Sequence, residues 1–206
     1  MNKEFLKIIQ KAEEIFQTAR FGYADLTSSN RARRFSGLRN LIVFGRSVTF
    51  VIQNLKRPAG EERFNTWYEP IQEEMKTDVV MKYFVTLRNQ ILKEGKLPIS
   101  TSVSASFSTN DIAKLGSPPP GAKGFFLGDR TGGSGWIIEL PDGTKEQYYI
   151  EIPEAMAKIQ QHFNELPLPD NDELKSKSIE ELCLYYLNKL ENVIDSARKE
   201  FLNNDT

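Results

Sequence analysis

The chain has very few of the residues that build metal and redox sites. Among 206 residues there is one cysteine, Cys183, and one histidine, His162. A single cysteine excludes an internal disulfide bond, and a structural zinc site needs about four ligands, which cysteine and histidine alone do not supply here. Nucleophilic catalysis of the Ser-His-Asp or Cys-His kind would have to use His162. We therefore expect no metal site and no cofactor.

Long apolar runs and an excess of one charge are also absent. No run approaches the roughly 18 apolar residues of a membrane span, and residues 1–20 mix charged with apolar residues, unlike a signal peptide. The net charge is −1, so only a local patch, and not a global field, would attract nucleic acid. We predict a cytoplasmic protein that does not contact a membrane.

Apolar residues recur three and four apart over much of the chain, a pattern that indicates amphipathic helices. We expect helices over residues 3–20, 35–56, 64–75 and 77–94. Pro70 should break or restart the third, because proline removes a backbone donor and clashes with the preceding turn. Gly45 lies on the inward face of the second and predicts the close approach of a neighbouring helix.

The helix predicted over residues 77–94 carries an Arg-Asn pair, Arg88-Asn89. We expect Thr77 to cap its start and Gly95 to close its end in the left-handed conformation. Arg88 lies on the edge of the buried stripe, half in the core and half in a groove. That stripe consists of Val80, Phe84, Leu87 and Ile91.

The apolar period changes to two after residue 98, which is typical of half-buried strands. One strand is expected over 99–107, and a β-meander over 123–152 with a turn at 141–144. The loop GDRTGGSG (128–135) lacks the Lys-Ser/Thr ending of a phosphate loop and precedes a strand, so it reads as a flexible hairpin loop. Residues 110–123, which contain SPPPG, are expected to form a stiff exposed loop.

The C-terminal part is predicted to return to helices. Pro153 should open a helix with Met156, Ile159 and Phe163 inward, and residues 166–173 read as a linker. Residues 178–181, SIEE, form a capping box that starts a final helix to about residue 202.

The predicted fold is therefore mainly α, a helical bundle with a small antiparallel β-sheet insertion. We expect one domain, 1–206, with the bundle formed by 1–96 and 153–206 and the meander inserted at 97–152. The helices before the meander must pack against the helices after it, because neither set alone buries all its apolar faces.

Segments 45–55, 64–78 and 84–95 resemble a pattern that recurs in bacterial proteins. More broadly, the chain resembles the HEPN-like helical bundles of toxin–antitoxin and phage-defence systems. There a long helix carries an arginine, a polar residue and, a few positions later, a histidine. Arg88 and Asn89 match the first half, whereas Lys93, Glu94 and Gly95 stand where the histidine is expected. The resemblance implies RNA association and a dimer with the arginine in a cleft between protomers.

The missing histidine favours binding over catalysis. RNA cleavage without a metal needs a proton acceptor for the 2′-hydroxyl and stabilisation of the developing phosphorane charge. The enzyme alternative is an endoribonuclease that uses Arg88 and Asn89, with Lys93 or His162 as the base. His162 would serve only if the helix after Pro153 folds back beside Arg88. The Arg-Asn pair would otherwise tie its helix to a neighbouring backbone.

Basic residues gather before and within the second helix, where Arg39 and Arg46 are seven apart and share a face. We predict that four of them contact nucleic acid, namely Arg31, Arg34, Arg39 and Arg46. The alternative is a solvated face that pairs with glutamates.

Our leading hypothesis is a non-catalytic protein that binds RNA or a protein partner, as a homodimer. Its place in bacterial defence or a toxin–antitoxin system comes from the resemblance only. A third hypothesis is a protein-interaction module that works through the β-insertion. Its contact residues would be the aromatic side chains of Trp136 and Tyr148.

Overall fold

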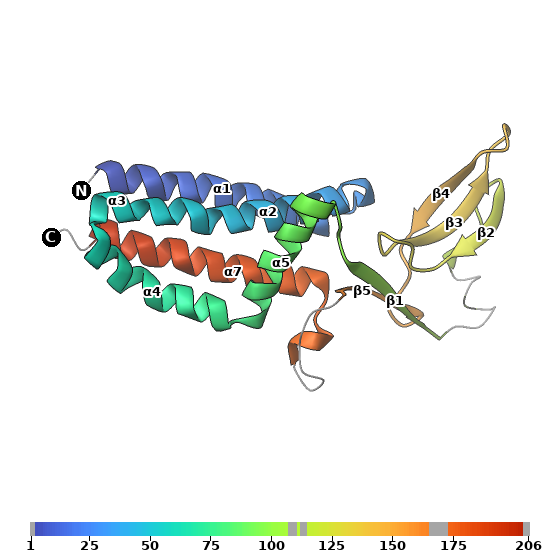
Figure 1. The fold of residues 1–206 in the computed structure, drawn as a ribbon. Coiled ribbons are helices and arrows are strands. Elements are labelled where there is room, and N and C mark those ends of the chain that lie inside the picture. Colours follow the sequence, from blue (N-terminus) through green and yellow to red (C-terminus); the bar gives the residue numbers. More distant parts are fainter. Residues whose placement is uncertain (1–2, 107–110, 112–114, 165–172, 204–206) are drawn as a thin grey trace. The chain divides into compact units, whose positions relative to one another are not determined.

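The computed structural model of the chain describes residues 3–106, 111, 115–164 and 173–203. These fall into two compact units (Figure 1). The helical unit comprises Met1–Pro98 and Glu165–Thr206, and the sheet unit comprises Ile99–Asn164. The fold class is confirmed: helices dominate, and the strands form small antiparallel sheets.

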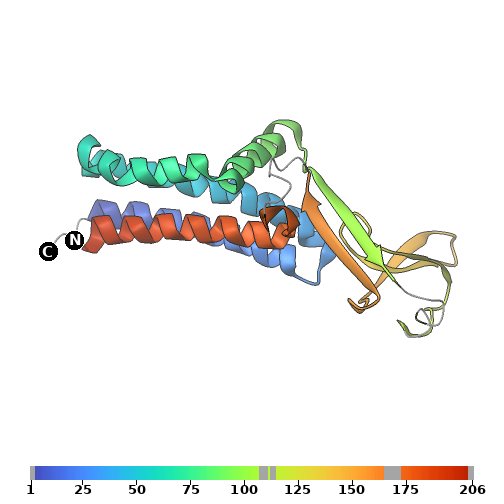
Figure 2. The same ribbon diagram turned by 90° about the horizontal axis from the view of Figure 1, so that it is seen from below.

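The helical unit is built on three long helices, α1 (Lys3–Thr27), α2 (Arg34–Ile52) and α7 (Ile179–Arg198). They lie side by side (Figure 1, Figure 2), and α7 runs antiparallel to α1. The start of α1 and the residues after α7 therefore meet at one end, where the rings of Phe5 and Phe201 are 5.1 Å apart. The unit also contains α3 (Lys56–Ala59), α4 (Glu61–Thr77) and α5 (Val79–Glu94).

Helices from both sides of the insertion share one core, as predicted. The ring of Tyr186 on α7 stacks on Phe84 of α5, with centroids 4.2 Å apart. Trp67 of α4 donates its indole N–H to Ser196 of α7 at 2.9 Å. Ser178 and Glu181 form the predicted capping box at the start of α7.

Helix α1 runs seven residues beyond its predicted end at residue 20. Gly22 does not stop it, because the residue is needed for close packing of α1 on α2. A Cβ on Gly22 would lie 2.5 Å from the carbonyl oxygen of Gly37. Gly22 is therefore a point of close contact between α1 and α2.

Two local predictions about α4 and α5 are wrong. Pro70 neither breaks nor restarts α4, which continues through it to Thr77. Both Pro70 and Thr66, whose carbonyl loses its usual donor, are exposed, so water can hydrate that carbonyl. Thr77 does not cap α5 but bonds back to the Glu73 and Glu74 carbonyls of its own helix.

The residue that caps α5 is Asp78, whose carboxylate accepts from the Met81 N–H at 3.0 Å. Aspartate is as good an N-cap as threonine, and it stands one residue closer to the apolar stripe. Gly95 closes the helix as predicted, with φ of 65°. The predicted stripe is also buried, and it consists of Val80, Phe84, Leu87 and Ile91.

The sheet unit holds two antiparallel sheets. Strands β1 (Ile99–Ala105) and β5 (Ala157–Phe163) form a two-stranded ribbon. The predicted meander is confirmed as β2 (Ala122–Phe126), β3 (Ser134–Glu139) and β4 (Lys145–Ile150), in that order. Leu140 and Thr144 close the turn between β3 and β4, the N–H of the first donating to the carbonyl of the second at 2.8 Å.

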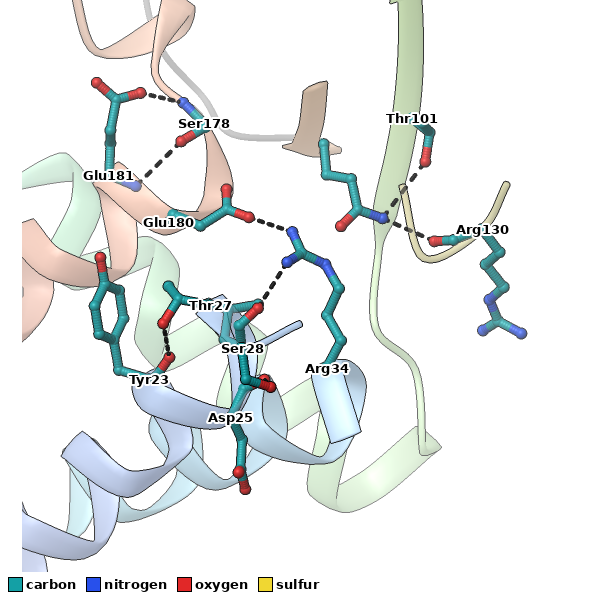
Figure 3. A network of polar contacts seen from close by, with 12 residues as sticks. Tyr23, Asp25, Thr27, Ser28, Arg34, Thr101, Arg130, Ser178, Glu180 and Glu181 are labelled. Atoms are coloured by element: carbon teal, nitrogen blue, oxygen red, sulfur yellow. Dashed lines mark hydrogen bonds and ion pairs between the residues drawn. The ribbon is translucent and has the colours of Figure 1, made fainter. Parts of the chain in front are cut away.

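The helix predicted after Pro153 is wrong, because residues 157–163 are strand β5. The apolar residues of this segment have helical spacing, but the buried residues of the strand are Ala157, Gln161 and Phe163, and Ile159 is half-buried. Gln161 is buried because its amide donates to the Arg130 carbonyl at 2.7 Å and to the Thr101 hydroxyl at 3.4 Å (Figure 3). The sheet unit therefore extends beyond residue 152. The described residues do not include Phe107, at the end of the predicted first strand, or most of residues 108–114. They also leave out most of the predicted linker, residues 166–173.

One helical stretch, Arg31–Ala59, is long and apolar enough to cross a membrane, with mean hydropathy 1.2 over its best window. Of that window, 44% is buried within the protein, and a core helix of a soluble protein meets the same criteria. The absence of a membrane contact thus stays a prediction.

Candidate functional site

The helical unit contains a cleft of about 390 Å³, formed by residues of α2, α4, α5 and α7. Its apolar lining includes Met75, Met81 and Val85. Its polar lining includes Arg46, Gln53, Gln72, Lys82, Thr86 and Tyr186, and none of the described lining residues is acidic. The cleft is therefore cationic and suits a ligand with both apolar and negatively charged parts.

Beside this cleft, two arginines from different helices converge on one aromatic ring. The guanidinium carbon of Arg46 on α2 lies 4.3 Å from the centroid of the Phe50 ring, and that of Arg88 on α5 lies 5.9 Å from it. Phe50 is 47% exposed despite this contact. Arg46 and Phe50 are four apart on α2 and so share a face.

Most hydrogen-bond donors of these arginines have no acceptor among the described residues. Arg46 donates to the hydroxyl of Thr49, and Arg88 donates to the Asn89 side chain at 3.1 Å. Within the described part of the chain, neither forms an ion pair with a carboxylate. A guanidinium has five N–H donors in a planar fork, so each arginine retains several for an oxyanion. We call Arg46, Phe50 and Arg88 the arginine–phenylalanine cluster.

The residues considered for catalysis do not come together in one unit. Asn89 accepts from Arg88, and Lys93 is exposed in the last turn of α5. His162 lies on β5 of the sheet unit, where a ring nitrogen is 3.1 Å from the Ser102 hydroxyl. The helix that was to bring His162 beside Arg88 is strand β5, which belongs to the sheet unit, whereas Arg88 belongs to the helical unit.

Of the four arginines predicted to contact nucleic acid, Arg34 has a structural role. It pairs with Glu180 at the start of α7 and donates to the Leu26 carbonyl at 2.7 Å (Figure 3). Its side chain is only 12% exposed. Arg31, in the short helix before α2, also has a partner. These two residues are therefore weaker candidates for a ligand contact.

The other two predicted contacts differ in their surroundings. Arg39 reaches the end of α5, where it donates to the Gly95 carbonyl at 3.4 Å. Arg46 alone of the four lines the cleft. Phe50, Lys82 and Tyr186 were not predicted as site residues. The spacing of Phe50 four residues after Arg46 was the one available signal.

Two tyrosines of the cleft carry raised pKa values. Burial raises the pKa of Tyr186, and the nearby positive charge of Arg46 opposes this only in part. Burial also raises the pKa of Tyr68, against Arg46 and a hydrogen bond with Gln53. Both hydroxyls therefore stay protonated and uncharged at neutral pH.

The predicted partner residues of the sheet unit stand in one row. Phe125, Trp136 and Tyr148 are directly opposite one another on β2, β3 and β4 and so share a face. The rings of Phe125 and Trp136 meet edge to face at 4.8 Å, while Tyr148 is 51% exposed. The register thus leaves Tyr148 as the accessible end of the row.

The loop between β2 and β3 is fastened by Asp129. One carboxylate oxygen accepts from the N–H and hydroxyl of Thr131, each at 2.8 Å, and from the Gly133 N–H at 2.7 Å. The other accepts from the Tyr149 hydroxyl at 2.7 Å. Partial burial raises the pKa of Asp129, but these hydrogen bonds outweigh it, so the pKa lies below its usual value.

Among the described residues, no group of three or more histidines, cysteines and carboxylates is placed to hold a metal ion.

In the comparison with protein families, residues 30–114 match the family described as Bacteriophage lambda protein ea47. No curated protein and no solved structure matches the chain. The matched segment contains the whole arginine–phenylalanine cluster, and it excludes Trp136, Tyr148 and His162.

This match overturns the HEPN resemblance, because residues 30–114, which include the Arg-Asn pair, match a different family and nothing supports HEPN. The Arg-Asn pair that carried the resemblance is a short motif and lacks its histidine. The dimer and the defence context therefore lose the support they had, and RNA binding must rest on this chain's own residues. Over residues 30–114, which include the arginine–phenylalanine cluster, the chain is similar to the phage lambda protein ea47.

Proposed function

We propose that the helical unit binds single-stranded nucleic acid, and RNA in particular, through the arginine–phenylalanine cluster. The observation that carries this proposal is the position of Arg46 and Arg88. Both contact the exposed ring of Phe50, and neither pairs with a described carboxylate.

The cluster combines the two contacts that single strands use. A guanidinium fork matches the oxygens of a phosphate, often with two parallel hydrogen bonds. An exposed aromatic ring offers a face or edge on which an unstacked base can pack, and such packing contributes about 1–3 kcal/mol per base. A duplex buries its base faces, so an exposed Phe50 favours a single strand.

The distribution of charge also points to the helical unit. The sheet unit, residues 99–164, has five basic and seven acidic residues, so it repels rather than attracts a polyanion. The cleft adds Lys82, which has no ion-pair partner in the described part of the chain. Because the net charge of the chain is −1, binding should be local and should weaken steeply with salt.

The test is equilibrium binding of a labelled RNA of about twelve nucleotides, a length within the usual site size. We expect Arg46→Gln and Arg88→Gln each to weaken binding about tenfold, since a hydrogen bond to a charged group contributes about 1.5–3 kcal/mol. The matched control is Arg198→Gln, because Arg198 is exposed and already paired with Glu13 and Asp195. Equal affinity of all four proteins, or no binding at all, would contradict the proposal.

A second candidate is a protein-interaction surface on the sheet unit, which the exposure of Tyr148 favours. Exposed aromatic residues at the end of a packed row often anchor protein interfaces. Here Tyr148→Ser should abolish an interaction that Arg88→Gln leaves intact. The reverse result would assign the interaction to the helical unit.

A further inference from the structure

We infer that the cleft beside Arg46 holds one unstacked base of the bound strand and distinguishes it from other bases. This inference rests on the proposed function, but it concerns different atoms. The arginine–phenylalanine cluster would hold the backbone, whereas the cleft would read the base.

The first step is the hydroxyl of Tyr186. Tyr186 is 1% exposed and lines the cleft, and its ring is held by stacking on Phe84. Its hydroxyl makes no hydrogen bond to any residue that the structure describes. The hydroxyl is not among the fully buried polar atoms without a partner, so it keeps some accessible surface, and Tyr186 lines the cleft. An unpartnered hydroxyl at a cleft wall can donate to or accept from a polar ligand atom.

The second step is the chemistry of the cleft walls. Gln72 has no hydrogen-bond partner among the described residues, and its amide both donates and accepts. Base edges present donors and acceptors side by side, which an amide and a hydroxyl match. Met75, Met81 and Val85 supply apolar surface for the faces of a ring. The volume of about 390 Å³ is within the usual range for small-ligand pockets.

The third step is the position of Arg46, which belongs to both features. Arg46 lines the cleft, and it also contacts Phe50, which is not a lining residue. A nucleotide whose base enters the cleft would therefore place its phosphate within reach of a guanidinium. The lining contains no carboxylate that would repel this phosphate.

The experiment compares four homopolymeric RNAs on the wild type and on Tyr186→Phe, which removes the hydroxyl and keeps the ring. We expect the wild type to prefer one base by about fivefold or more, and Tyr186→Phe to reduce the preference below about twofold. The control is Tyr185→Phe, because Tyr185 bonds to Asp78 and does not line the cleft. Tyr186→Phe should resist denaturant about as well as the wild type, since the lost hydroxyl makes no hydrogen bond to a described residue.

The outcomes separate this inference from the proposed function. If RNA binds through Arg46 and Arg88 but all four homopolymers bind equally, or Tyr186→Phe keeps the preference, the base pocket is wrong and the proposed function stands. If no RNA binds, but adenosine or uridine monophosphate binds and Tyr186→Phe weakens it, both are overturned in favour of a site for free nucleotides.

Discussion

Gly45 on α2 lies directly against the ring of Tyr186 on α7: a Cβ on Gly45 would be 2.6 Å from Cε1 of that ring. No real side chain is tolerated at that distance without movement. Tyr186 also lines the cleft, so the position of its ring depends on this contact. Gly45 therefore affects both the packing of α2 on α7 and the shape of the candidate site.

Gly45→Ala should destabilise the helical unit by about 1–3 kcal/mol, because the added methyl overpacks the core. At an exposed helical position the same change stabilises by up to about 1 kcal/mol. Asn40→Ala, on the exposed side of α2, is the control and should be neutral or slightly stabilising. Chemical denaturation measures both, and a stabilised Gly45→Ala would show that α2 and α7 are not in this contact.

Arg34→Met should cost about 2–3 kcal/mol of stability, since it leaves Glu180 and the Leu26 carbonyl without a charged partner. Arg33→Met should cost less than about 1 kcal/mol, because the Arg33–Asp25 pair is more exposed. Urea denaturation of both variants tests this difference. Equal losses would mean that the Arg34–Glu180 pair is as solvated as a surface pair.

Asp129 should make the stability of the sheet unit depend on pH. Its folded-state pKa is lowered, so its contribution is present above the unfolded value of about 3.9 and is lost as pH falls through the folded-state value. Asp129→Asn should therefore destabilise at pH 7 and lose that deficit in acid. Fluorescence of Trp136 in a Trp67→Phe background reports this unit alone. A deficit that is constant with pH would rule out the carboxylate as the cause.

Two residues of the aromatic row on β3 and β4 should differ in their effect on stability. Trp136→Ala should cost about 1–3 kcal/mol, because its ring packs against Phe125. Tyr148→Ser should cost less than about 1 kcal/mol, because Tyr148 is half-exposed. Thermal denaturation of both variants shows which substitution costs more stability. If Tyr148→Ser is the more damaging change, the row is a core element and not a contact surface.

The spacing of apolar residues was sufficient to predict an element where its buried residues repeat at a single period. The stripe of α5 and the meander of β2 to β4 were predicted because apolar residues repeat at three to four and at two residues. The same reasoning was wrong after Pro153: Met156, Ile159 and Phe163 have helical spacing, but residues 157–163 form strand β5. Pairing with β1, more than fifty residues earlier, decides that conformation, and no local pattern contains it.

The candidate site was predictable only in part for a similar reason. Partial burial of Arg88 follows from its place at the edge of the α5 stripe. Its contact with Phe50 requires α5 to pack on α2, and the pairing of Arg34 with Glu180 spans 146 residues. The sequence does not show whether an arginine pairs with a carboxylate. Arg34, which does, and Arg46, which does not pair with a described one, were therefore grouped together.

Salt dependence is the most direct measurement of phosphate contacts by Arg46 and Arg88. For single strands, the logarithm of the binding constant falls with the logarithm of salt concentration by about 0.7 per neutralised phosphate. Arg46→Gln and Arg88→Gln should each reduce the slope by about 0.7, and the double variant by about 1.4, with Arg198→Gln equal to wild type. Slopes that do not change in the double variant would show that these arginines do not contact phosphate.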